Sequence, residues 1–143
     1  MRIVIDNNII LDALLERQQF NKIAEQILII CADTHKGCLS ANSLTDIFFV
    51  LRKCIKASEA KNAIKKLTEL FEIISVNDED CINALSLPID DFEDALVIIC
   101  AKKAGADYII TRDNLLLKTE SPIPIISPNR FLEILTINNN SRL

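Results

Sequence analysis

Four aspartates occupy positions where a folded chain would bring acidic side chains together. Asp6 directly follows an apolar segment, residues 2–5, and Asp113 follows a second apolar segment. Asp46 and Asp94 each lie near the start of a segment with helical periodicity. An Asp at such a position is often only a helix cap or a turn residue. The candidate site therefore depends on the four acids in combination.

The chemistry that such a cluster supports is metal-assisted hydrolysis. Carboxylates packed together repel one another and take up protons unless a cation lies between them. Their oxygens are hard ligands, which favour Mg²⁺ or Mn²⁺ over zinc. One such ion, or a pair, orients a phosphodiester, ionises an attacking water and stabilises the leaving oxygen. The acids thus predict hydrolysis of a nucleic-acid strand.

Alternating strands and helices must position these acids. Apolar runs rich in β-branched residues predict strands at residues 2–5, 38–40, 71–76, 108–111 and 123–126. Helical spacing and capping residues predict helices at about 9–14, 23–31, 44–55, 58–70, 78–86, 92–104 and 128–135. This alternation predicts a three-layer α/β/α fold with a mostly parallel central sheet of about four to five strands. Ligands bind such sheets beyond the carboxyl ends of the strands.

Local features set the expected boundaries. Gly37 is predicted to end the second helix, and Asp46 is expected in the first turn of the third. No internal repeat or linker divides the 143 residues, so one domain is expected over residues 1–137. Residues 138–143 are polar and are expected to form a frayed, flexible tail.

Composition narrows the partners. The net charge is −4 and the pI is near 5.0, which by itself disfavours nucleic acid. A local basic stretch nevertheless contains Arg52, Lys53, Lys56, Lys61, Lys65 and Lys66. We interpret this stretch as a region that helps to bind RNA, and a merely solvated helix face is the alternative. Apolar runs are far shorter than the roughly 20 residues of a membrane helix, so we expect a cytoplasmic protein without a membrane span.

The cysteines do not predict a metal or disulfide framework. Five are present, an odd number without a CxxC pair, and most lie in apolar helical patterns that suit reduced buried thiols. Cys31, His35 and Cys38 would supply three zinc ligands, but an obvious fourth ligand is missing. Zinc at this cluster is therefore disfavoured.

The chain resembles a known family, the PIN domain, and in particular the group that includes VapC-like toxins of toxin–antitoxin pairs. The segments that carry the resemblance are residues 2–12, 40–53, 91–96 and 108–113. PIN domains open with Asp, a hydroxyl residue and Asn; Asp6 and Asn8 match, whereas Asn7 replaces the hydroxyl residue. The second acid of the family is commonly Glu, and here Asp46 is one methylene shorter.

The resemblance implies a Mg²⁺- or Mn²⁺-dependent endoribonuclease that hydrolyses RNA phosphodiesters. The implied metal and catalytic residues are Asp6, Asp46, Asp94 and Asp113, with Asn8 and Thr111 orienting ligands or phosphate. Asp91, one helical turn before Asp94, competes with it for the third position. Toxins of this group usually form homodimers and are held inactive by an antitoxin, so both partners are inherited expectations.

Two other classes of function remain as alternatives. A catalytically inactive PIN-like module that binds RNA or protein is the first, because the shorter Asp46 weakens the case for metal binding. A receiver-type phosphoacceptor also uses a strand-end Asp and a cation, but it needs a Lys after a late strand, where Arg112 and Asp113 stand here. Nucleotide-cofactor folds need a glycine-rich loop, and only Gly37 and Gly105 are present.

Overall fold

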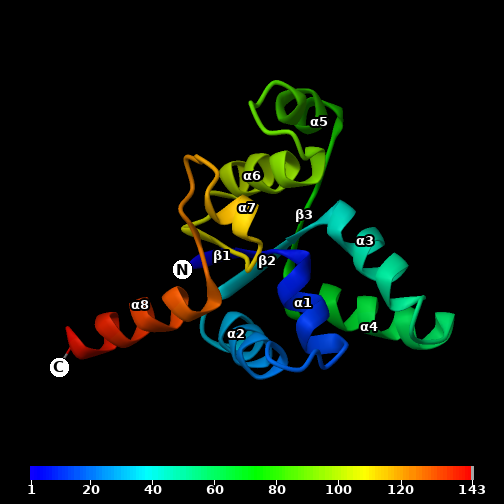
Figure 1. The fold of residues 1–143 in the computed structure, drawn as a ribbon, viewed down its shortest axis with the longest axis horizontal. Helices are drawn as coiled ribbons and strands as arrows, with labels where there is room; N and C mark the ends of the chain where they lie inside the picture. The colour runs from blue at the N-terminus through cyan, green and yellow to red at the C-terminus, as the bar shows by residue number, and fades with distance from the viewer. Residues whose placement is uncertain (143) are drawn as a thin grey trace.

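The fold is built on a five-stranded sheet, seen in a computed structural model that describes residues 1–142 (Figure 1). The strands are β1 (Arg2–Ile5), β2 (Lys36–Ser40), β3 (Glu72–Ile74), β4 (Tyr108–Ile110) and β5 (Ile125–Ile126). Their order is β3-β2-β1-β4-β5, and every neighbouring pair is parallel. The predicted α/β fold with a parallel central sheet is confirmed.

Helices cover both faces of this sheet. They are α1 (Asn7–Leu14), α2 (Asn21–Asp33), α3 (Ala41–Leu51), α4 (Ala57–Leu70), α5 (Asp78–Leu85), α6 (Phe92–Ala104), α7 (Asn114–Leu117) and α8 (Pro128–Asn140). Side chains of β1 alternate between the faces, because successive residues of a strand point in opposite directions. Ile3 and Ile5 pack in the core with α1 to α4 and α8, whereas Val4 packs with α6 and α7. Helix α5 packs on the outer side of α6 (Figure 1).

The sheet order places the site. The chain winds from β1 to β2 and β3, and then returns to add β4 on the other side of β1. The winding therefore reverses between β1 and β4, and such a switch point opens a crevice at the carboxyl ends of the strands. Asp6 lies at that end of β1, where its backbone N–H donates to the carbonyl of Ile110 on β4 at 3.0 Å.

Glycine has a different role at residue 37 than the sequence predicts. Helix α2 ends at Asp33, and Gly37 lies inside strand β2. A Cβ at Gly37 would lie 2.6 Å from Cδ1 of Phe71 and 3.0 Å from the Cβ of Cys31. Close packing against α2 and the ring thus requires glycine. Gly105, by contrast, ends α6 with a left-handed φ of 64°, as predicted.

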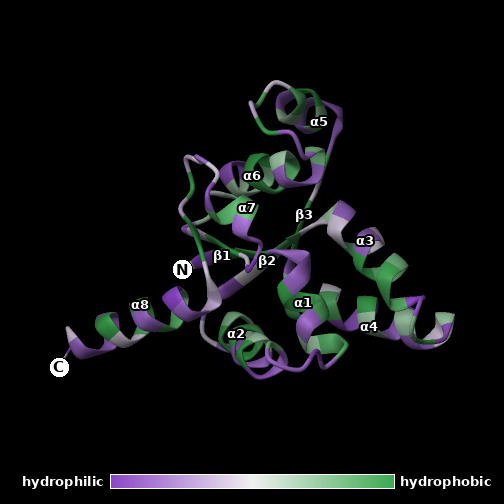
Figure 2. Cartoon of the chain, viewed as in Figure 1, coloured by the Kyte–Doolittle hydropathy of each residue, from purple (hydrophilic) through white to green (hydrophobic). Residues whose placement is uncertain are grey.

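Several other element boundaries also differ from prediction. Helix α3 begins at Ala41, so Asp46 lies in its second turn rather than its first. The predicted loop after β4 contains the short helix α7. Helix α8 continues to Asn140, past the expected end at Leu135, and alternates hydrophilic and hydrophobic residues along its length (Figure 2). Leu143, the last residue of the expected tail, lies outside the described residues.

No helix within residues 1–142 combines the length and the apolar character that crossing a membrane requires.

Candidate active site

An acidic cleft lies at the carboxyl edge of the sheet. It has a volume of about 420 Å³, and its walls come from α1, the α1–α2 connection, α3, α6 and the turn after β4. The acidic residues that line it are Asp6, Asp46, Asp91, Glu93, Asp94 and Asp113. All four aspartates singled out from the sequence therefore line one cleft, and two further acids lie with them.

Asp6 is held by a set of short hydrogen bonds. Its Oδ1 accepts the backbone N–H of Asn7 at 2.9 Å, as the N-cap of α1. Its Oδ2 accepts the hydroxyl of Thr111 at 2.7 Å and the side-chain amide of Asn8 at 3.1 Å. Asp6 itself is buried, with 9% of its surface exposed. These donors fix the direction in which the carboxylate meets the cleft.

Thr111 and Asn8 link strand β4 to helix α1. Asn8 Nδ2 also donates to the Thr111 hydroxyl oxygen at 3.1 Å, and that oxygen accepts the backbone N–H of Asp113 at 3.0 Å. Thr111 is fully buried, whereas Asn8 lines the cleft. The contacts of both side chains therefore orient Asp6 and the turn that carries Asp113.

Like Asp6, further acids of the cleft cap or begin helices. Asp113 caps α7 by accepting the backbone N–H of Leu115 at 2.9 Å. Asp91 caps α6 by accepting the backbone N–H of Asp94 at 2.9 Å, which places Asp94 in the first turn. Helix N-termini carry partial positive charge, which favours nearby carboxylates. Asp91 and Asp94 both line the cleft, and only one oxygen of Asp91 is occupied by the cap.

The acids disfavour one another's ionised form. Burial raises the pKa of Asp6, and the charges of Asp113 and Asp91 raise it further, against the hydrogen bonds from Thr111 and Asn7. Burial, and then the charges of Asp91, Asp6 and Asp113, raises the pKa of Asp94 to about 6. This is the behaviour expected of carboxylates that share a cleft without a counter-charge.

Glu93 and Asn7 are site residues that the sequence analysis missed. Burial, together with the charges of Asp46, Asp6 and Asp91, raises the pKa of Glu93 to about 7. Asn7 Nδ2 donates to Glu93 Oε1 at 2.8 Å, whereas Asn7 Oδ1 is buried without a hydrogen-bond partner among the described residues. The run of acids from Asp91 to Asp94 in the first turn of α6 was the sequence signal for Glu93.

An ion pair with a buried carboxylate connects helix α1 to the turn after β4. Asp12, on α1, is 1% exposed and accepts Arg112 Nε at 2.6 Å and Arg112 Nη2 at 2.9 Å. Arg17 Nη1 adds a third contact at 3.2 Å. The Arg112 guanidinium also lies over the ring of Phe20, 4.1 Å from its centroid. Since Arg112 stands between Thr111 and Asp113, the pair ties their turn to α1.

The donor set suits a hard cation, although the ligands are not preassembled. Carboxylates and the free amide oxygen of Asn7 are the oxygen ligands that Mg²⁺ and Mn²⁺ take. Within residues 1–142, no three Asp, Glu, His or Cys side chains are arranged as a ready-made ligand set.

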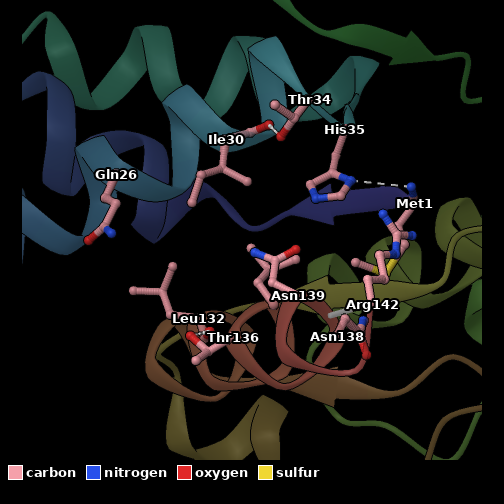
Figure 3. Close-up of a pocket in the computed structure, with 11 residues that line it drawn as sticks. Met1, Gln26, Ile30, Thr34, His35, Leu132, Thr136, Asn138, Asn139 and Arg142 are labelled. Carbon is pink, nitrogen blue, oxygen red and sulfur yellow. Dashed lines mark hydrogen bonds between the residues drawn. The ribbon is translucent and has the colours of Figure 1, made fainter.

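A second cavity, of about 590 Å³, lies between α2 and α8 (Figure 3). Figure 3 shows His35 beside Met1. The N-terminal amine of Met1 lies 3.3 Å from Nδ1 of His35. Among the described residues, those that line this cavity include none of the four candidate aspartates. Although it is larger than the acidic cleft, it lacks the carboxylates on which the predicted chemistry depends.

A family profile of the PIN domain matches residues 2–115, which include all the residues of the acidic cleft. The chain belongs to the PIN-domain family. The resemblance seen in the sequence is thereby confirmed.

Known proteins resemble this chain along most of its length. Ribonuclease VapC1 of Aquifex aeolicus (strain VF5) is 28% identical over 138 residues, covering 92% of this chain and 94% of that protein. Two solved structures share the fold. VapBC2 from Rickettsia felis, bound to a fragment of promoter DNA, has a TM-score of 0.66 at 15% identity, covering 89% of this chain and 98% of that chain. VapC20 of Mycobacterium tuberculosis, a toxin that cleaves the sarcin–ricin loop, has a TM-score of 0.66 at 13% identity, covering 80% of this chain and 92% of that chain.

Proposed function

We propose that this PIN-domain protein is a Mg²⁺- or Mn²⁺-dependent endoribonuclease and the toxin of a toxin–antitoxin pair. The observation that carries the proposal is the gathering of six carboxylates in one cleft at the switch point of the sheet. A relative that covers nearly the whole chain is named a ribonuclease, which supports RNA as the substrate.

Each acid has a role in the proposal. Asp6, Asp46 and Asp94 would hold the metal, and Asp113 would complete the acidic ring. The bound cation supplies charge to orient the phosphodiester and to ionise the attacking water. Asn8 and Thr111 hold Asp6 Oδ2 in place through their hydrogen bonds, so that one carboxylate stays fixed while the others adjust. The free Oδ1 of Asn7 is a further oxygen that faces no donor among the described residues.

Cleavage of single-stranded RNA tests this proposal. The purified protein is expected to cleave in Mn²⁺ or Mg²⁺ and to lose cleavage in EDTA. Asp6→Asn is expected to abolish cleavage while far-UV circular dichroism stays unchanged. Asp33→Asn is the matched control, because Asp33 is exposed at the end of α2, away from the cleft. Equal cleavage by the Asp6 variant, or cleavage in EDTA, would refute the proposal.

A catalytically inactive module that binds RNA or protein is the second candidate. It is favoured by the lack of three preassembled metal ligands within residues 1–142, and by the short side chain of Asp46. Titration with Mn²⁺ separates the two candidates. A nuclease should bind the ion through Asp6 and lose affinity in Asp6→Asn, whereas a scaffold should show no dependence on that side chain.

The expected protein partners belong to the same proposal. Similar structures include a toxin–antitoxin complex from Klebsiella pneumoniae, 19% identical with a TM-score of 0.66, which supports an antitoxin partner. Co-purification of the product of an adjacent small gene with this chain, together with loss of RNA cleavage in the complex, would test it. Light scattering on the isolated chain would test the expected homodimer, since a monomeric mass contradicts it.

A further inference from the structure

Beyond the acids, the cleft is lined by an exposed aromatic ring. Phe49, one of six phenylalanines in the chain, is 66% exposed and lines this polar cleft. It is on α3, three residues after Asp46, so the two side chains are neighbours about 4.5 Å apart along the helix axis. The wall of α3 thus presents a carboxylate and then a flat apolar surface.

Two cationic side chains, Lys53 and Arg17, lie near the ring or in the same cleft. The Nζ of Lys53 lies 4.8 Å from the centroid of Phe49, in a cation–π contact beyond the end of α3. Arg17 lines the same cleft from the α1–α2 connection and is the one cation among the described residues that do so. Its guanidinium donates one hydrogen bond to Asp12, and its other N–H groups remain available as donors to a ligand.

The backbone around Arg17 is held in an unusual shape. Glu16 and Gln19, which flank it, have φ angles of 48° and 70°, in the left-handed region that side chains other than glycine rarely adopt. The Arg17 carbonyl accepts the N–H groups of Phe20 at 3.1 Å and Asn21 at 2.8 Å. These contacts hold the backbone of Arg17 in place where its side chain lines the cleft.

We propose that Phe49, Arg17 and Lys53 form a subsite for one unpaired nucleotide next to the phosphodiester held by the acids. The base stacks on Phe49, and its phosphates meet Arg17 and Lys53. This inference rests on the proposed function and deepens it, because it selects single-stranded RNA over duplex. Stacking on an aromatic ring accepts any base, whereas a paired base has no free face to offer.

Charge favours a nucleotide over a protein side chain at this position. An apolar partner residue placed on Phe49 would cover the Lys53 ammonium without offering it an anion. A nucleotide supplies an aromatic face for the ring and anionic oxygens for both cations. The exposed basic residues that continue along the chain, such as Arg52 and Lys56, extend the same positive stretch.

A tryptophan reporter tests the stacking directly. The protein has no tryptophan, so Phe49→Trp creates a single fluorophore at the subsite. In EDTA, where metal-dependent cleavage does not interfere, a short unstructured RNA should quench its emission saturably, and a blunt duplex of the same sequence should not. Ile29→Trp is the control, because Ile29 is 61% exposed on α2 and does not line the cleft; its emission should stay unchanged.

Binding by side-chain variants completes the test. Phe49→Leu should weaken single-stranded RNA binding about tenfold, and Phe49→Tyr should preserve it. Lys53→Gln should lower the salt dependence of binding by roughly 0.7 in log–log slope. Absence of quenching together with unchanged binding by Phe49→Leu would overturn the subsite. A change of oligomeric state in Phe49→Leu with normal RNA binding would also overturn it, and would assign the ring to a second copy.

These outcomes are separable from those of the proposed nuclease activity. If the wild-type chain cleaves RNA in Mn²⁺ but Phe49→Trp is not quenched and Phe49→Leu binds RNA normally, the nuclease stands and the subsite fails. If quenching is saturable but no cleavage occurs in any metal, the subsite stands and the catalytic proposal fails.

Discussion

Replacement of Arg112 by Met should destabilise the protein severely, because it leaves a buried charge with too few partners. Asp12 is 1% exposed and has three N–H donors from two arginines. Arg112 supplies two of them, at 2.6 and 2.9 Å, whereas Arg17 keeps one at 3.2 Å. Met retains most of the aliphatic stem, so the variant removes mainly the charge and the hydrogen bonds.

The expected magnitude follows from the burial of Asp12. Removing one partner of a buried ion pair typically costs about 3–5 kcal/mol in the free energy of unfolding. Because Arg17 still contacts Asp12 and the side chain of Arg112 is itself 33% exposed, we expect the lower end, about 3 kcal/mol. For a chain of this length, that loss lowers the melting temperature by roughly 10 °C.

Urea unfolding followed by circular dichroism measures the effect. The matched control is Arg130→Met, which breaks a pair with Glu133 whose side chains are 54% and 62% exposed. Exposed pairs contribute little, so this variant should lose no more than about 0.5 kcal/mol. Both variants should keep the wild-type dependence of unfolding free energy on urea, because the surface exposed on unfolding is the same.

A double replacement separates pair loss from general damage. Combining Asp12→Leu with Arg112→Met removes both charges, and should recover much of the stability that Arg112→Met loses. A loss of stability in Arg112→Met as small as in the Arg130 variant would contradict the expected cost of an unpaired buried charge. A double variant less stable than the sum of the single variants predicts would contradict it as well.

Two further predictions concern charge and packing. Glu93 and Asp94 have pKa values raised to about 7 and about 6, so they bind protons more tightly in the folded than in the unfolded protein. In the metal-free protein, their contribution to the free energy of unfolding should be full below about pH 4 and be lost as pH rises toward 7, and saturating Mn²⁺ should offset that loss. A rise in unfolding free energy over this range would contradict it. Gly37→Ala should lower the free energy of unfolding by about 1–3 kcal/mol, because the added Cβ would meet the Phe71 ring. Gly105→Ala should lower it by about 1 kcal/mol, from backbone strain alone, because the space around Gly105 is open. Equal melting temperatures of the two variants would contradict this.

The elements that were predicted correctly depend on residues that are adjacent in the sequence. Residues 2–5 are continuously apolar and stop at Asp6, which marks a buried strand that meets solvent at its end. Gly105 and the Ser127–Pro128 pair also gave correct helix ends, because capping depends on a few adjacent residues. Gly37 was misread, since the ring that requires a glycine there comes from Phe71, far along the chain.

The parts of the site that escaped prediction all depend on contacts between distant residues. Asp12 and Arg112 are 100 positions apart, and neither has a local pattern that reveals its partner. The hydrogen bond from Asn7 to Glu93 spans 86 positions, so the raised pKa of Glu93 had no signal beyond the neighbouring acids. Sequence pattern can place acids at one edge of a sheet, but packing determines which of them meet.

The most direct test of the shared acidic site is an anomalous-scattering map from crystals grown in saturating Mn²⁺. We expect an ordered manganese peak in the cleft, contacted by Asp6 and by at least one of Asp46, Asp94 and Asp113. A well-ordered cleft without a peak, or manganese bound only elsewhere on the molecule, would contradict it.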